Sequence, residues 1–239
     1  VAHDWGSIQS WGAATDPRSE GRLASFTSIS GPSLDMAADW LRRGAGGTVA
    51  ALRQLADSYY IFGFQAPALP ERIVRSGVLD RLVTHSSHKG TPWRRHRPVE
   101  HRPTRDAING LELYRANFLT RMARPAPGRV NVPVQVLAPT DDAHVTSRLQ
   151  REAPRPFVDD LYAREIVGNH WVVAQKPHVV ARCVTEFIDH VGGGPLPRSL
   201  RPGRHQDVAR PLGLDHADQF GERLVLITGA GSGIGRASA

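Results

Sequence analysis

The 239-residue sequence predicts an α/β protein with an open parallel sheet that is interrupted by an all-helical insertion. Two observations predict this class. Short apolar runs alternate with helical patterns in the first 33 residues and again in residues 125–192, and polar residues follow these runs. Between them, over residues 34–124, the apolar spacing is helical throughout. We therefore expect core residues 1–33, a helical cap at 34–124 and further core residues at 125–192.

The first elements follow the opening stretch "VAHDWGS". The stretch "SIQSWGAATD" has small and apolar residues at helical spacing and ends at the breaker "DPRSEG", so it predicts a helix. "RLASFTSIS" is rich in Ser, Thr and apolar residues and ends in "GPS", which is typical of a buried strand closed by a turn. The predicted order is turn, helix and strand.

Helical patterns then fill the insertion, in "LDMAADWLRRG", "GTVAALRQLADSYYIFGF", "PERIVRSGVLDRLV" and "RDAINGLELYRANFLTRMA". Beyond the insertion, "VNVPVQVLAPTDD" predicts a strand that ends in acids, and "YAREIVGNHW" predicts a strand that ends in a histidine. "KPHVVARCVTEFIDHV" predicts an amphipathic closing helix. Polar residues at the carboxyl ends of parallel strands are expected to meet at one edge of the sheet.

The last part of the sequence has a different character. Residues 193–222 are rich in Gly, Pro and charge without periodicity, which predicts a linker. Residues 223–239, "RLVLITGAGSGIGRASA", predict a short buried strand, a glycine turn and the start of a helix. Such a turn lets phosphate groups approach the N-terminus of a helix, so this segment predicts the first strand-turn-helix of a Rossmann fold.

The composition and charge of the sequence argue against several classes of protein. The net charge of +7 comes from arginine, because Lys89 and Lys176 are the only lysines. The Arg and His residues concentrate in residues 85–106 without the interleaved aromatics that stack on bases, so we expect no nucleic-acid partner. Cys183 stands alone in an apolar pattern, which favours a packing residue in a reducing, cytoplasmic compartment. No apolar run reaches the ~20 residues of a membrane span.

The opening residues have the spacing of a nucleophile elbow. Ala2-His3-Asp4-Trp5-Gly6 places small residues on either side of Asp4, as a strained strand-to-helix turn requires. A carboxylate at this tip attacks an electrophilic carbon and forms an ester. A triad on such a sheet runs nucleophile, acid, histidine, and Asp142 and His170 follow the later strands in that order.

Each of these residues has an alternative role. Asp4 alone could serve as a turn or cap acid, and either Asp141 or Asp142 could cap a helix over "VTSRL". His170 could be a core histidine, and we expect His144 to be a loop residue.

Residues 1 to about 192 resemble an epoxide hydrolase of the α/β-hydrolase superfamily, in "HDWG", "YYIFGFQAPALPE", "NGLELYRANF", "VPVQVLAPTDD" and "GNHWVV". The resemblance favours Asp142 over Asp141 as the acid. It also implies two cap tyrosines that donate hydrogen bonds to the epoxide oxygen. These are Tyr60, with Tyr59 as a substitute, and Tyr114; the alternative is that both are ordinary packing residues of the cap.

The resemblance implies a two-step reaction. Asp4 opens a small, apolar epoxide while Tyr60 and Tyr114 stabilise the oxygen. His170 then activates the water that hydrolyses the ester, and the backbone N–H of Trp5 helps to hold the oxyanion. The product is a vicinal diol, and this hydrolase needs no metal or organic cofactor.

The segment "LITGAGSGIG" resembles the start of a short-chain dehydrogenase/reductase, which implies an NAD(P) site in the parent protein. The residues that carry this resemblance are Thr228, Gly229, Gly233, Ile234 and Gly235. The catalytic tyrosine and lysine of that family, and the strands and "His-Gly-x-Pro" turn that precede a hydrolase elbow, are missing. We therefore expect a slice of a longer hydrolase–dehydrogenase fusion that is aggregation-prone and inactive in isolation.

Two rival functions fit the same residues. A haloalkane dehalogenase shares the aspartate elbow and "HDWG" but holds a halide with ring N–H or amide donors, so the cap tyrosines favour the epoxide. A non-catalytic remnant is the rival of a different class. The sequence carries no prediction of the oligomeric state.

Overall fold

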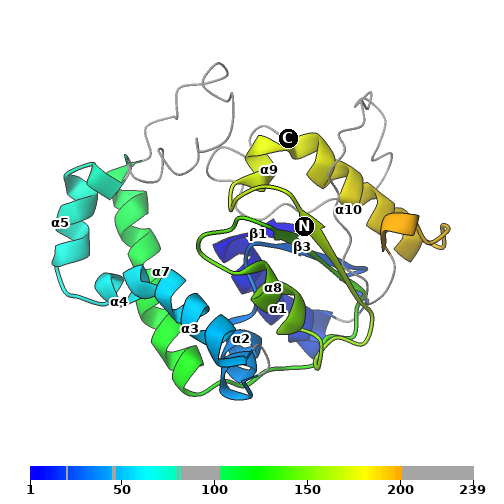
Figure 1. Ribbon diagram of the computed structural model, residues 1–239, viewed down its shortest axis with the longest axis horizontal. Coiled ribbons are helices and arrows are strands. Elements are labelled where there is room, and N and C mark those ends of the chain that lie inside the picture. Colours follow the sequence, from blue (N-terminus) through cyan, green and yellow to red (C-terminus); the bar gives the residue numbers. More distant parts are fainter. Residues whose placement is uncertain (20, 45–46, 80, 82–102, 201–239) are drawn as a thin grey trace.

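The computed structural model describes residues 1–19, 21–44, 47–79, 81 and 103–200, and every structural statement below concerns these residues (Figure 1). The predicted dehydrogenase start at 223–239, with Thr228, Gly229, Gly233, Ile234 and Gly235, lies outside them. So do most of the linker predicted at 193–222 and the greater part of the Arg- and His-rich stretch at 85–106.

Four parallel strands form the sheet, in the order β1-β2-β3-β4. They are β1 (Ala2–His3), β2 (Phe26–Ile29), β3 (Val134–Pro139) and β4 (Leu161–Ile166). The register pairs His3 with Ile29, Ile29 with Leu137, and Leu137 with Arg164. The predicted parallel α/β sheet is therefore confirmed, and its strands end at a common edge.

The two faces of the sheet carry separate apolar clusters. Alternate side chains of β3 divide between them, because Val134 and Val136 pack in one cluster and Leu137 packs in the other. The first cluster includes residues of α1 (Trp5–Thr15) and lies beside α8 (Ser147–Glu152). The second includes α9 (Val172–Gln175) and the closing helix α10 (Pro177–Val191), so helices cover both faces (Figure 1).

The described residues of the predicted cap form helices joined by short turns. It consists of α2 (Leu34–Arg42), α3 (Gly47–Asp57), α4 (Tyr59–Phe64), α5 (Leu69–Arg75) and the long α7 (Thr104–Ala123). Figure 1 shows these helices gathered at one side of the sheet, with α7 running past the others. The helical insertion between β2 and β3 thus has the arrangement expected from its 3.6-residue periodicity.

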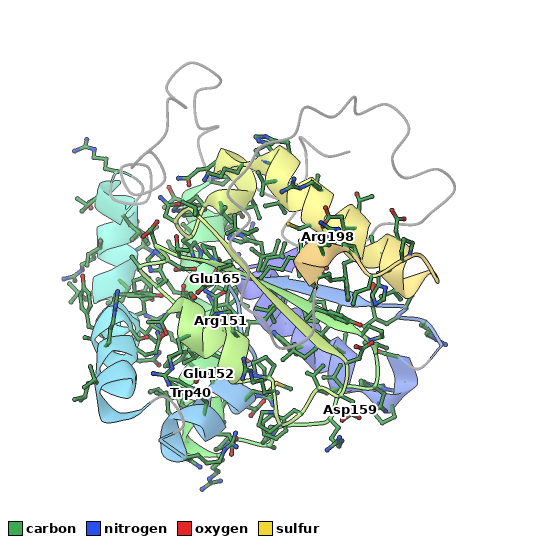
Figure 2. All side chains as sticks on the ribbon, turned by 45° about the vertical axis from the view of Figure 1, so that its right-hand side comes forward. Trp40, Arg151, Glu152, Asp159, Glu165 and Arg198 are labelled. Atoms are coloured by element: carbon green, nitrogen blue, oxygen red, sulfur yellow. The ribbon has the colours of Figure 1, made fainter. Side chains whose placement is uncertain are left out.

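One cap helix, α2, packs as part of the core. Met36 and Trp40 are buried in the same cluster as the strands, and the indole Nε1 of Trp40 donates to the Glu152 carboxylate at 3.0 Å. Figure 2 shows Trp40 beside Glu152, with Arg151 and Glu165 nearby, and Arg151 forms a 3.0 Å ion pair with Glu165 of β4. These contacts fix α8 from two sides.

The ordered chain continues past the end of α10. Residues 198–200 form a short 3₁₀ turn, η3 (Arg198–Leu200), and the side chain of Leu200 packs against Tyr162 and Phe187. Ser199 donates a 2.8 Å hydrogen bond to Glu186. The start of the segment predicted as a linker is therefore packed, because its Leu200 side chain covers the edge of β4, whereas Leu196 is exposed. Among the described helices, none combines the length and apolar character needed to cross a membrane.

Candidate active site

The turn between β1 and α1 places Asp4 in a strained backbone conformation. Its φ of 53° and ψ of −131° lie in a region that L-residues rarely adopt. Two hydrogen bonds hold this geometry, from Asp4 N to Ile29 O and from Ile8 N to Asp4 O, each 3.0 Å long. Trp5 is the first residue of α1, so its backbone N–H has no partner within the helix.

Gly31, after β2, packs directly against the elbow. A Cβ atom at this position would lie 2.2 Å from the carbonyl oxygen of Asp4 and 2.7 Å from Cβ of Ser7. The Gly31 carbonyl accepts hydrogen bonds from Ser7 Oγ at 2.7 Å and Trp11 Nε1 at 3.0 Å. The elbow spacing in the sequence predicts only Ala2 and Gly6 as spacing residues and not Gly31, whose available signal is the "SGPS" turn.

His170 lies between the two predicted carboxylates. Its Nε2 is 3.7 Å from Oδ1 of Asp4, and its Nδ1 is 3.2 Å from both carboxylate oxygens of Asp142. Asp142 follows β3 and His170 follows β4, so neighbouring parallel strands present them at the same edge. Asp142 and His170 are buried, whereas the Asp4 side chain is 43% exposed and open to a reactant.

Charge and burial act in opposite directions within this pair. Burial works to lower the pKa of His170, but the charge and hydrogen bond of Asp142 and the charge of Asp4 outweigh it, so its pKa is raised above 6.5. Burial works to raise the pKa of Asp142, yet His170 and two backbone N–H groups hold it below its ordinary value. Asp142 is therefore an anion that stabilises the protonated imidazole.

The structure distinguishes Asp142 from its neighbour Asp141. Oδ1 of Asp142 accepts hydrogen bonds from His144 N at 2.9 Å and Val145 N at 3.1 Å. Asp141 is exposed, and its side chain accepts a hydrogen bond from Thr140 Oγ1. Neither acid caps the following helix α8, because Thr146 Oγ1 accepts from Leu149 N instead. The capping alternative for these acids is wrong.

Tyr60 and Tyr114 face Asp4 from the cap. Burial and the negative charge of Asp4 raise the pKa of both hydroxyls, to about 12 for Tyr114 and further for Tyr60. Their ring centroids are 6.3 Å apart, and the ring of Tyr114 meets that of Trp5 edge-on at 4.8 Å. Tyr59 is 75% exposed, so Tyr60 is the tyrosine brought to the site.

Arg115 ties the two tyrosine-bearing helices together. From α7 it donates to the carbonyls of Phe64 at 3.0 Å and Ala66 at 2.9 Å, and it forms a 2.6 Å ion pair with Glu71. Because Arg115 follows Tyr114 and Phe64 ends the helix of Tyr60, these contacts set the distance between the two hydroxyls.

Two further histidines surround His170. His3 Nε2 donates to the carbonyl of His170 at 2.8 Å, and burial followed by the charge of His170 lowers the pKa of His3 to about 4. His3 is therefore a neutral clamp on the His170 backbone at pH 7. His144, predicted as a loop residue, lies in a loop but packs its ring 4.8 Å from His170 and 5.5 Å from Tyr60.

The fold and the site together define the class: an α/β-hydrolase fold with an aspartate at the nucleophile elbow and a histidine–aspartate pair behind it. No family model matches the sequence. Proteins with the printed name "Probable oxidoreductase EphD" from Mycobacterium bovis and Mycobacterium tuberculosis are 31% identical over 251 residues. The match covers 100% of this chain but only 40% of the length of those relatives.

Solved structures share the fold at low sequence identity. An epoxide hydrolase from Bacillus megaterium is 17% identical, with a TM-score of 0.56 over 78% of this chain and 67% of its own. An epoxide hydrolase of the α/β-hydrolase superfamily from hot-environment metagenomes is 22% identical, with a TM-score of 0.54 over 79% and 66%. A "Putative Acyltransferase" from Salmonella enterica is 15% identical, with a TM-score of 0.58 over 80% and 64%. At these identities the likeness concerns the fold.

Proposed function

We propose that residues 1–192 carry an epoxide hydrolase site that converts an epoxide to a vicinal diol through an ester on Asp4. One observation carries the proposal: two half-buried cap tyrosines, with ring centroids 6.3 Å apart, lie near the same aspartate that lies 3.7 Å from a buried, carboxylate-paired histidine. A carboxylate nucleophile, an acid for the leaving oxygen and a base for water are the three groups that this reaction needs.

In the first half of the reaction, an Asp4 oxygen attacks one epoxide carbon and the ring C–O bond breaks. The departing alkoxide takes a proton from the tyrosine pair. We assign the donation to Tyr114, because its pKa of about 12 is the lower of the two. The product of this half is a hydroxyalkyl ester of Asp4.

In the second half, His170 Nε2 removes a proton from water, and the hydroxide attacks the carbonyl carbon of the ester. The resulting oxyanion is stabilised at the start of α1 by the N–H of Trp5. Collapse of this intermediate breaks the acyl C–O bond, and the diol oxygen that leaves takes the proton from His170. The proton of the Asp4 carboxylic acid so formed returns to the tyrosinate left by the first half, so Asp4 is again a carboxylate and both tyrosines are neutral. Asp142 stabilises the imidazolium between these transfers, and no metal or organic cofactor takes part.

A haloalkane dehalogenase would use the same nucleophile but needs N–H donors for the leaving halide. The indole of Trp5 adjoins Asp4 in the chain, and its ring packs edge-on against that of Tyr114 at 4.8 Å. The two hydroxyls favour an alkoxide over a halide as the leaving group. A small, apolar epoxide is the substrate class that suits the aromatic rings of Trp5, Tyr60, Phe64 and Tyr114.

We propose in addition that these residues belong to a longer protein that also contains an NAD(P)-dependent short-chain dehydrogenase. The support is the glycine-rich stretch at residues 226–235 and the greater length of the mycobacterial relatives that are described as oxidoreductases. The activities of the whole protein would then be two, with the hydrolase independent of the dinucleotide.

The test uses the full-length protein and two substrates, styrene oxide and 1-chlorobutane. We expect diol from the epoxide and no chloride release from the chloroalkane. A single turnover in ¹⁸O-water with enzyme in excess should leave the diol unlabelled and place one ¹⁸O on the peptide that contains Asp4. Chloride release without diol formation would establish the dehalogenase, and inertness towards both substrates would establish the non-catalytic alternative.

A further inference from the structure

A buried amide on cap helix α3, Gln54, reaches across to the loop that holds the catalytic acid. Its Nε2 donates to His144 O at 3.0 Å, and its Oε1 accepts from Thr146 N at 2.9 Å and from Thr146 Oγ1 at 3.0 Å. A fourth hydrogen bond joins Nε2 to Ser58 Oγ at 3.1 Å. Gln54 is 6% exposed, so these bonds satisfy an amide that water scarcely reaches.

Three of these four bonds go to residues 142–146, which we call the acid loop. The acid loop begins at Asp142 and ends at Thr146, the N-cap of α8. Within it, His144 and Val145 aim their backbone N–H groups at the Asp142 carboxylate. A cap residue that fixes His144 O and Thr146 N therefore fixes the peptide groups that orient Asp142.

A second buried amide, Gln150 of α8, holds the acid loop from the core. Its Nε2 donates to Val145 O at 2.9 Å and lies 3.4 Å from Oδ2 of Asp142, while its Oε1 accepts from Ser30 N at 3.2 Å. Ser30 precedes Gly31 at the elbow and has a φ of 52°. The core side of the acid loop is thus anchored independently of the cap, and Gln54 supplies the anchor on the other side.

Gln54 is also close in the chain to Tyr60, one of the two tyrosines of the proton-donating pair. Ser58, which its amide bonds, immediately precedes α4, the helix that carries Tyr60. One side chain therefore bridges the α3–α4 junction of the cap and the acid loop of the core. The bridge joins the element that serves epoxide opening to the element that serves ester hydrolysis.

We infer that Gln54 is a positioning residue. It holds the acid loop in the conformation in which the Asp142 carboxylate contacts and orients the His170 imidazole. The kinetic part of this inference rests on the proposed epoxide hydrolase function, whereas the effect on His170 itself does not. Loss of the amide frees one side of the acid loop and weakens the Asp142–His170 contact. Ester hydrolysis, which uses His170, is then slowed more than attack by Asp4, which does not use it.

The test replaces Gln54 by methionine, which has a similar length and no hydrogen-bonding amide, in the full-length protein. The matched control is Gln65→Met, because Gln65 is a half-buried cap amide whose Nε2 donates to Ile61 O within its own helix. With styrene oxide, Gln54→Met should slow ester hydrolysis on the order of 10-fold, below the 10²-fold that a 1 Å misplacement can cost. Formation of the ester should change much less, so ester accumulates.

A second readout needs no substrate. The pKa of His170, followed by NMR titration of its ring, should fall towards 6.5 in Gln54→Met and stay raised in Gln65→Met. Gln54→Glu keeps the oxygen acceptor for Thr146, so it should restore part of the rate of ester hydrolysis and part of the raised His170 pKa. The same variant provides the test if Gln54→Met does not fold. An unchanged His170 pKa, or equal slowing of ester formation and hydrolysis, would overturn the inference. Absence of any ester in the unmutated protein would instead reject the proposed function, while the titration still decides the role of Gln54.

Discussion

The core half and the cap half of the site are held in different ways. In the core, Asp4, Asp142 and His170 follow strand ends, and backbone hydrogen bonds fix each of them, from Ile29 O at Asp4 to the His3 ring at His170 O. In the cap, Tyr60 and Tyr114 stand on helices, and their positions depend on side chains such as Arg115. The sheet places the core residues, with side-chain bonds from Gln54 and Gln150 added at the acid loop, whereas side-chain contacts place the cap tyrosines.

This difference predicts unequal sensitivity. The core residues follow directly on paired strands that restrain their backbone, so substitutions in the core should change chemistry with little change in geometry. The two tyrosines pack against Phe64, and Arg115 holds their helices together. Substitutions in the cap should therefore change the position of the proton donor as well as the chemistry. The experiments below test that contrast, from the largest expected effect to the smallest.

Replacing the core nucleophile should have the largest effect. Asp4→Asn removes the attacking carboxylate without changing its size, and epoxide hydrolysis should fall on the order of 10⁴-fold or more, as for other residues of a catalytic triad. Asp16→Asn, at the exposed end of α1, is the matched control and should keep full activity. Diol formation measured by mass spectrometry checks both variants, and substantial turnover by Asp4→Asn would contradict the assignment.

The cap tyrosines should come next. Changing both Tyr60 and Tyr114 to Phe should slow epoxide opening about 10²-fold, the loss typical of a positioned acid. Of the single variants, Tyr114→Phe should be slower, because Tyr114 has the lower pKa. Tyr59→Phe serves as the control, since Tyr59 is exposed. Stopped-flow measurement of ester formation compares the four proteins, and a larger loss in Tyr60→Phe would reverse the proposed order of donors.

Elbow packing gives a stability effect of intermediate size. Gly31→Ala places a Cβ 2.2 Å from Asp4 O, so the free energy of unfolding should fall by about 1–3 kcal/mol, as overpacking costs elsewhere. Gly12→Ala, on helix α1 with open space around its Cβ position, should instead be neutral or stabilising by up to about 1 kcal/mol. Urea unfolding of both variants measures the contrast, and equal stabilities would show that the elbow relaxes freely.

The pH dependence is the smallest effect expected. Ester hydrolysis needs neutral His170, so its rate should rise with pH through a midpoint above 6.5, because Asp142 raises the pKa of His170. The same shift stabilises the fold below pH 6.5, and this contribution is lost as pH rises through the raised value. Asp142→Asn should move the midpoint to lower pH and slow hydrolysis, whereas Asp141→Asn should not. An unchanged midpoint in Asp142→Asn would show that Asp142 does not raise the pKa of His170.

The core half could be predicted from the sequence because its residues obey local rules. An acid after a strand and a histidine after the next strand meet wherever the two strands are parallel neighbours. The contact between Asp142 and His170 could therefore be predicted without knowing the structure of the cap. The resemblance favours Asp142 over Asp141, although adjacent acids after a strand share the other local signals. Their burial and hydrogen bonds separate them.

The contacts that hold the site could not be predicted. Gln54 lies in the helical pattern "GTVAALRQLADS", where a glutamine is normally a solvated residue, and its partners are about 90 residues away in the sequence. His144 has no local signal that places its ring between Tyr60 and His170. Burial of Leu200 depends on a space beside β4 that only the folded sheet defines. These are long-range packing effects, and periodicity does not report them.

The most direct test of the central claim is to trap the ester on Asp4. His170→Gln keeps a polar side chain in place but removes the base, so attack by Asp4 can occur while hydrolysis cannot. After treatment of the full-length variant with styrene oxide, the peptide that contains Asp4 should gain the mass of one substrate molecule, and the unmutated protein should show no lasting gain. An adduct on another residue, or full turnover by His170→Gln, would contradict the account.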